Sequence, residues 1–300
     1  MNIKRLLIFK FLIFNLLFIS IIIIKLLHRL KVLLCTIGKE ENKYIKEFIN
    51  HYRKLKIKKI ILYDNNNIDG ENFKDILKNY ISKNFVEIIN YRGIQLPQKK
   101  ALYDCYKKYN KNYDWIAFYD VDEFLEIINY TNINKFLSLT KFKKCQSILI
   151  NWKIYGDNNQ LYYRAEPLFK RFIRPFYLTN ESLKFNKYLT SAAKTIVRGG
   201  LNIIWQHFPH YLNNTIKCRP DGKIVNNYFT FPQYSIAYIK HYTTKSTEEF
   251  AERLNKGDVN VKMDDNFIRR RINKYYFFIN TKTKEKIKLL KEKLKNKIKF

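Results

Sequence analysis

Between residues 30 and 145, short apolar runs alternate with amphipathic stretches. The apolar runs are typical of buried strands, whereas the amphipathic stretches repeat apolar residues at i, i+3, i+4 and i+7, as helices do. The predicted strands and helices alternate in the order 32–37, 41–55, 59–64, 71–80, 85–91, 98–109 and 115–120. This alternation predicts βαβ units around a mostly parallel sheet, and therefore an α/β fold.

The pattern changes after residue 145 to strands and aromatic loops punctuated by prolines, which we interpret as the second half of the same domain. Near the end of the chain, residues 281–300 predict a basic amphipathic helix. Its apolar face carries Ile287, Leu290, Leu294 and Ile298. Such a helix packs on the domain or lies on an anionic membrane, and the sequence leaves both alternatives open.

The beginning of the chain is strongly apolar, with sixteen apolar residues among the nineteen of 6–24. That length is close to the ~20 residues that cross a bilayer core. The apolar run is longer than that of a signal peptide, and no small-x-small cleavage site follows it. We therefore predict a membrane anchor over residues 1–29, with its orientation open because basic residues flank it on both sides.

Composition describes a globular chain with an unusual charge. The 300 residues are 46% hydrophobic and can bury a large core, while 57 Lys and Arg against 26 Asp and Glu leave a net charge of +31. Such a charge suggests a polyanionic partner, but lysines occur in every segment, which argues against a nucleic-acid patch. The 8 glycines form neither a P-loop nor a G-x-G-x-x-G motif, so nucleotide binding through a glycine-rich loop loses its main support.

The cysteines do not have the spacing of zinc ligands. They are Cys35, Cys105, Cys145 and Cys218. We predict buried free thiols, with disulfides as the alternative in an oxidising compartment, where the connectivity would not be readable. Three N-x-[ST] sequons, which would be glycosylated only in a lumen, lie at Asn129, Asn180 and Asn213.

Two carboxylates follow the apolar strand predicted at 115–120. Asp120-Val-Asp122 places both on the same side of an extended chain, because side chains alternate with period two. Ligands of open α/β sheets bind beyond the carboxyl ends of strands, so this pair predicts Mg²⁺ or Mn²⁺ holding a diphosphate. The alternative is a solvated acidic turn.

A second candidate site precedes a helix near residue 250. Ser246-Thr-Glu-Glu249 is a capping box, so residues 241–245 form the loop that enters the helix. A helix N-terminus attracts anions, and we therefore predict that phosphate binds here. His241 would complete the metal sphere as a neutral imidazole and Lys245 would bind the diphosphate, whereas the alternative for His241 is a structural role.

Together these motifs resemble the metal-dependent nucleotide-sugar glycosyltransferases of the GT-A fold, in particular family 92 and its family 2-like relatives. The stretches that carry the resemblance are 32–52, 60–69, 98–125, 151–156 with 166–172, and 239–257. The resemblance implies a GT-A-type, Rossmann-like domain over 30–257, followed by a basic helical tail over 258–300. It also implies transfer of a sugar from a nucleoside diphosphate donor to a glycan hydroxyl, with inversion.

The resemblance and the positions along the chain suggest roles for particular residues. The donor-binding candidates are Thr36, Glu41, Asp64, Lys99 and Lys245, although Glu41 and Asp64 could be simple caps and Lys99 a solvated side chain. The metal candidates are Asp120, Asp122 and His241. An inverting transfer needs a general base, for which Asp157 and Glu166 are candidates. The alternative function is that of an inactive, basic, membrane-apposed protein that binds nucleic acid or anionic lipid.

Overall fold

The computed structural model describes residues 30–176, 192–202, 212, 215–228, 230–257, 264–279, 281–295 and 297. The predicted anchor over 1–29 and the sequons at Asn180 and Asn213 lie outside these residues. Among the helices of the described part, none combines the length and the apolar character needed to span a bilayer.

The sheet begins as predicted. The first strands are β1 (Val32–Gly38), β2 (Lys59–Asp64), β3 (Val86–Asn90) and β4 (Trp115–Phe118). They pair in the order β3-β2-β1-β4, and every pair among them is parallel. The connecting helices are α2 (Asn42–Lys54), α3 (Phe73–Ile81) and α4 (Gln98–Tyr109).

Beyond β4 the sheet becomes mixed. Its remaining strands are β5 (Glu123–Ile127), β6 (Ser147–Ile154), β7 (Ala193–Arg198), β8 (Lys217–Cys218), β9 (Ile224–Val225) and β10 (Ala237–His241). β7 runs antiparallel to both β4 and β6, while β10 is parallel to β6 and antiparallel to β5. The α/β fold is thus confirmed, with a mixed sheet flanked by helices.

The sheet is covered on both faces. Along β1, Leu34 faces a core that α2 and α3 complete, while Leu33 and Cys35 face a second core completed by α4. This arrangement explains the continuous apolar sequence of β1, since a strand buried on both faces has no solvated side. Two short helices, α5 (Ile133–Leu137) and α6 (Leu168–Arg171), and a 3₁₀ turn at Thr140–Phe142 complete this part.

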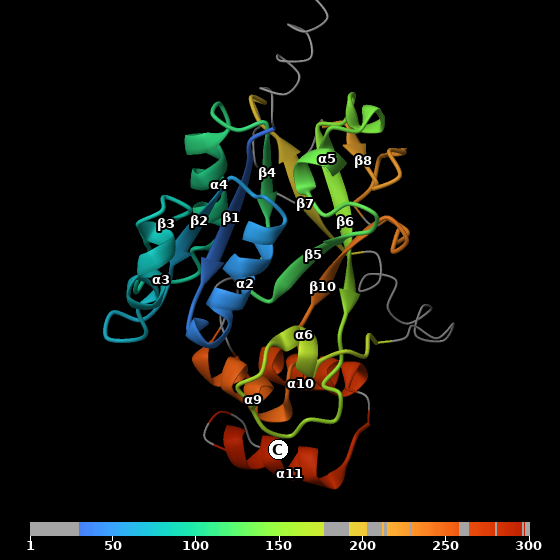
Figure 1. The fold of residues 1–300 in the computed structure, drawn as a ribbon. Coiled ribbons are helices and arrows are strands. Elements are labelled where there is room, and N and C mark those ends of the chain that lie inside the picture. The colour runs from blue at the N-terminus through green and yellow to red at the C-terminus, as the bar shows by residue number, and fades with distance from the viewer. Residues whose placement is uncertain are drawn as a thin grey trace, which may run out of the picture.

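Three helices gather at one end of the sheet, below it in Figure 1: α9 (Thr247–Lys256), α10 (Asp265–Phe278) and α11 (Lys284–Leu294). They share a hydrophobic cluster to which α11 contributes Leu290 and Leu294, both fully buried. Of the two alternatives for the tail helix, the structure therefore favours packing on the domain. α10 lies within the helical tail expected over 258–300, although the sequence pattern did not delimit it as a separate helix.

The prediction of free thiols was wrong. Cys35 is bonded to Cys105, which ties β1 to α4, and Cys145 is bonded to Cys218, which ties the start of β6 to β8. The partners lie 70 and 73 residues apart in the chain, so only the fold brings them together.

Candidate active site

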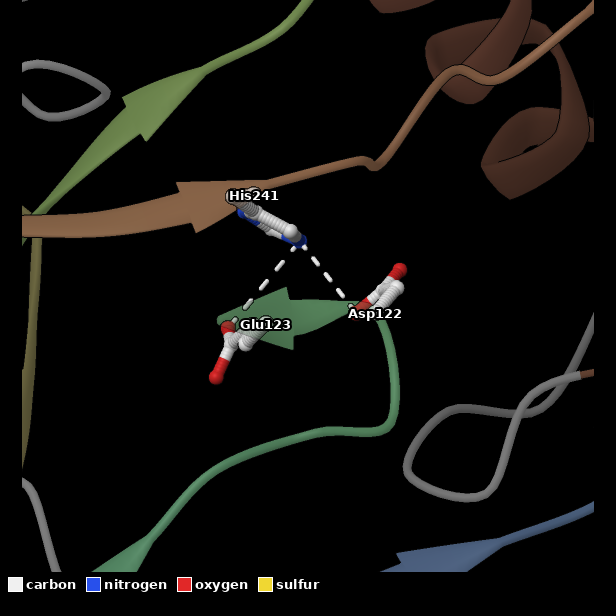
Figure 2. Close-up of side chains that lie close together, drawn as sticks. All are labelled: Asp122, Glu123 and His241. Carbon is white, nitrogen blue, oxygen red and sulfur yellow. Dashed lines mark ion pairs between the residues drawn. The ribbon is translucent and has the colours of Figure 1, made fainter. Parts of the chain in front are cut away.

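Three ionisable side chains meet where β5 begins and β10 ends. The two strands are antiparallel neighbours, and their register pairs His241 with Glu123, while Asp122 immediately precedes β5. Figure 2 shows the His241 ring pointing toward both carboxylates. Its Nε2 lies 3.7 Å from Asp122 Oδ1 and 4.0 Å from Glu123 Oε1, and one ligand atom from each residue falls within 4.8 Å of the others.

This triad fits a divalent cation. The separations of 3.7 and 4.0 Å are too long for hydrogen bonds but suit ligand atoms grouped around one ion. Glu123 Oε1 is buried and has no hydrogen-bond partner, which is costly unless something binds there. Two carboxylates and an imidazole are ligands that Mn²⁺ accepts readily. Sequence reasoning missed Glu123, although it directly follows Asp122.

Burial and neighbouring charges set the protonation state of each member of the triad. Burial, reinforced by nearby Arg253 and Lys194, lowers the pKa of His241 to about 3, so the imidazole is neutral and can act as a ligand. Burial opposes ionisation of Asp122, but the Arg253 charge and other neighbouring cations hold its pKa well below the usual range. Burial raises the pKa of Glu123, so a cation at the triad would favour its ionised form.

Asp120 does not belong to this triad. β4 ends at Phe118 and the chain turns before β5, so the predicted extended geometry of Asp120 and Asp122 was wrong. Asp120 instead accepts hydrogen bonds from Gln98 Nε2 at 2.9 Å and from the buried Lys194 Nζ at 2.7 Å. Lys194 also lies 3.3 Å from the other oxygen of Glu123, and it therefore holds Asp120 beside the triad.

The N-terminus of α9 does not offer a phosphate site. The capping box predicted at Ser246 is confirmed. The backbone N–H groups of residues 246 to 249 donate in order to Glu249 Oε2, Gln160 O, Leu161 O and Ser246 Oγ. With these groups already paired, the predicted anion site at this terminus was wrong.

Lys245 lies in the loop before α9 in a left-handed conformation, with a φ of 53°. Its ammonium sits 4.2 Å from the centre of the Tyr44 ring and 3.9 Å from the Glu41 carboxylate. The side chain is buried at the wall of a cavity of about 450 Å³ between α9 and the loops that follow β1 and β2. Both charge signs line this cavity, with Glu40, Glu41 and Glu71 facing Lys245, Arg253 and Lys256.

The sequence model of glycosyltransferase family 92 matches residues 28–294. The chain belongs to glycosyltransferase family 92. The match includes α9, α10 and all of α11, and so extends beyond the 30–257 boundary expected from the motifs.

Solved structures resemble this family 92 chain loosely. The 1–349 fragment of TarS from S. aureus is 15% identical, with a TM-score of 0.38 over 88% of this chain and 70% of that one. The same fragment in complex with UDP-GlcNAc is 14% identical, with a TM-score of 0.39 over 89% and 80%. The mannosyltransferase PcManGT from Pyrobaculum calidifontis, in complex with GDP-Man and Mn²⁺, is 8% identical, with a TM-score of 0.36 over 90% and 75%. No curated protein sequence matches significantly.

The donor-binding residues predicted for the glycosyltransferase lie in different surroundings. Glu41 and Lys245 line the cavity. Thr36 is fully buried within β1, and Asp64 is 3% exposed, accepts hydrogen bonds from Asn66 and pairs with Arg92 at 3.4 Å. Asp64 therefore holds the loop after β2. Lys99 is exposed on the first turn of α4.

The two base candidates also differ in accessibility. Asp157 is fully buried, its carboxylate lies 2.5 Å from Lys286 Nζ, and it accepts a hydrogen bond from the N–H of Asn159. This ion pair ties the loop after β6 to α11, which argues for a structural role. Glu166 is exposed in the loop before α6.

Proposed function

We propose that this family 92 glycosyltransferase has a GT-A fold and uses a divalent cation, Mn²⁺ or Mg²⁺. It transfers a sugar from a nucleoside diphosphate donor to a glycan hydroxyl, with inversion. The observation that carries the proposal is the triad of Asp122, Glu123 and His241, with its unpartnered buried oxygen, beside a cavity at the carboxyl ends of β1 and β2. Family membership supports the sugar transfer itself.

A cation held by Asp122, Glu123 and His241 would supply positive charge to the departing phosphate. Neighbouring residues of the chain set the protonation and the position of these ligands. Burial keeps His241 neutral, and Lys194 holds Glu123 by pairing with Oε2, the carboxylate oxygen that does not face His241. Lys245, fixed over the Tyr44 ring, adds positive charge at the cavity wall.

Inversion in one step requires a base that takes the proton of the acceptor hydroxyl as the sugar is transferred. Of the two candidates, Asp157 is already paired with Lys286 away from solvent. The exposed Glu166 is the carboxylate that an acceptor can reach, and we assign the base role to it.

The experiment that tests this function uses the full-length chain purified in detergent. Each of a panel of nucleotide sugars is supplied with Mn²⁺ and a mixture of glycan acceptors, and release of nucleoside diphosphate is measured. Wild type is expected to turn over one donor, and Asp122→Asn to be inactive. Asp75→Asn is the matched control, because this aspartate is exposed on α3.

Full activity of Asp122→Asn at limiting Mn²⁺ would contradict the metal assignment. Absence of turnover with every donor, together with salt-dependent binding of nucleic acid or anionic vesicles, would instead support the alternative of a basic binding protein.

The same proposal includes a membrane anchor at residues 1–29, supported by the apolar run at 6–24. The two disulfides support a position of the domain on the oxidising side of that membrane. We expect the protein to stay in the membrane fraction after carbonate and high-salt washes, because salt does not screen apolar insertion. Release by salt would indicate attachment through surface lysines instead.

A further inference from the structure

Four cationic side chains line the cavity in the described part of the chain: Lys43, Lys245, Arg253 and Lys256. Three of them pair with glutamates of the cavity wall. Lys43 lies 2.8 Å from Glu252, whereas Lys256 lies 2.5 Å and Lys245 3.9 Å from Glu41. Lys256 also donates to the carbonyl oxygens of the loop after β1, so its position is fixed by that loop.

Arg253 differs from these lysines in its partner. Its Nη1 donates to Asp122 Oδ2 at 3.0 Å and to the carbonyl oxygen of Thr243 at 3.1 Å. The other oxygen of the same carboxylate, Asp122 Oδ1, faces His241 in the triad. The side chain of Arg253 is 31% exposed and reaches the cavity. The Asp122 carboxylate therefore contacts Arg253 through one oxygen and faces the triad through the other.

We propose that Arg253 binds the diphosphate of the donor, and that Asp122 positions it for this task. The assignment rests on the proposed function. A guanidinium presents a planar fork that matches phosphate oxygens, which a lysine ammonium does not. A cation bound at the triad would be neutralised in part by the negative charge of Asp122. Asp122 would then neutralise less of the positive charge of Arg253, and the guanidinium would attract a phosphate more strongly.

The position of Arg253 also explains how the chain can bind phosphate although the N–H groups at the N-terminus of α9 are already hydrogen-bonded. The first-turn N–H groups of α9 are paired within the protein, whereas Arg253 lies in the second turn of the same helix and reaches the cavity. The positive charge comes from a side chain beside the triad rather than from the helix terminus.

The test is calorimetric titration of the full-length protein in detergent with a panel of nucleoside diphosphates (UDP, GDP, ADP, CDP and dTDP) and the matching monophosphates, at saturating Mg²⁺. Arg253→Gln is expected to weaken diphosphate binding about 10- to 100-fold, the range for charge-assisted hydrogen bonds. Arg253→Lys should lie between wild type and Arg253→Gln. Arg270→Gln removes the same charge from an exposed position on α10 and should bind as wild type does.

A second measurement separates this role from a structural one. Mn²⁺ affinity without nucleotide, followed by electron paramagnetic resonance, should not fall in Arg253→Gln, because the arginine competes with the ion for Asp122. Equal losses of Mn²⁺ and diphosphate affinity, or unchanged diphosphate affinity, would overturn the assignment while leaving the proposed function standing. Wild-type protein that binds no nucleoside diphosphate would overturn the proposed function, and this assignment with it.

Discussion

Removal of the Cys145–Cys218 disulfide should destabilise the domain strongly. The bond joins the start of β6 to β8, both half-cystines are buried, and 73 residues separate them in the chain. In the chain-entropy model, a loop of this length restricts the unfolded ensemble by about 15 cal/mol/K, which corresponds to about 4.4 kcal/mol at 25 °C. For a folded domain of roughly 270 residues this loss lowers the melting temperature by about 8 °C.

The assay compares thermal unfolding of wild type with the double variant Cys145→Ala/Cys218→Ala, followed by circular dichroism of the detergent-solubilised chain. Replacing both cysteines by alanine leaves no unpaired thiol and introduces no buried hydroxyl. The main change is therefore loss of the covalent bond that closes the loop from residue 145 to residue 218. Reductant should lower the melting temperature of wild type further than that of the variant. Equal melting temperatures without reductant, or free thiols at these cysteines in denatured wild type, would refute the reasoning.

Three further predictions follow from the site. Asp122→Asn should abolish Mn²⁺ binding measured by electron paramagnetic resonance, whereas Asp120→Asn should retain it, because Asp120 is held by a lysine and a glutamine outside the triad. Glu166→Ala should lower the turnover rate about 100-fold with donor affinity unchanged, as loss of a general base does, and near-normal turnover would place the base elsewhere. Asp157→Ala should cost about 3–5 kcal/mol of stability by removing the only carboxylate paired with the buried Lys286 among the described residues. Burial lowers the pKa of Lys274, on α10, from 10.5 to about 8, so between these values the unfolded chain binds more protons and Lys274 makes stability rise with pH. When urea midpoints are compared, this rise should be smaller in Lys274→Met than in wild type.

The strands and helices of the first half could be predicted because their signals are local. An apolar strand buried on both faces and a helix with one apolar face each leave a pattern within about ten neighbouring residues. The capping box at Ser246 is equally local, since its two hydrogen bonds join residues three positions apart. Within the helical tail expected over 258–300, the bounds of α10 were not predicted, because its sequence mixes arginines with aromatic residues and only its neighbours show which of them is buried.

The site depended on contacts that no local pattern contains. Asp122 and His241 were predicted as ligands, but the register of β5 against β10 decides that Glu123, rather than Asp120, is the third member beside them. The anion site at α9 failed because carbonyl groups of Gln160 and Leu161, more than 80 residues earlier, occupy the N–H groups that the sequence leaves open.

By itself, the sequence determined the α/β class, the order of its first strands and helices, and the carboxylate and imidazole residues from which a metal site could be built. Those features follow from periodicity and residue chemistry, which act over a few positions. Only the tertiary structure decided which cysteines pair, that Asp157 forms a buried ion pair with Lys286, and that Arg253 pairs with Asp122 of the triad. The reason is physical: each of these depends on two segments distant in the chain being brought within a few ångströms by packing of the whole core.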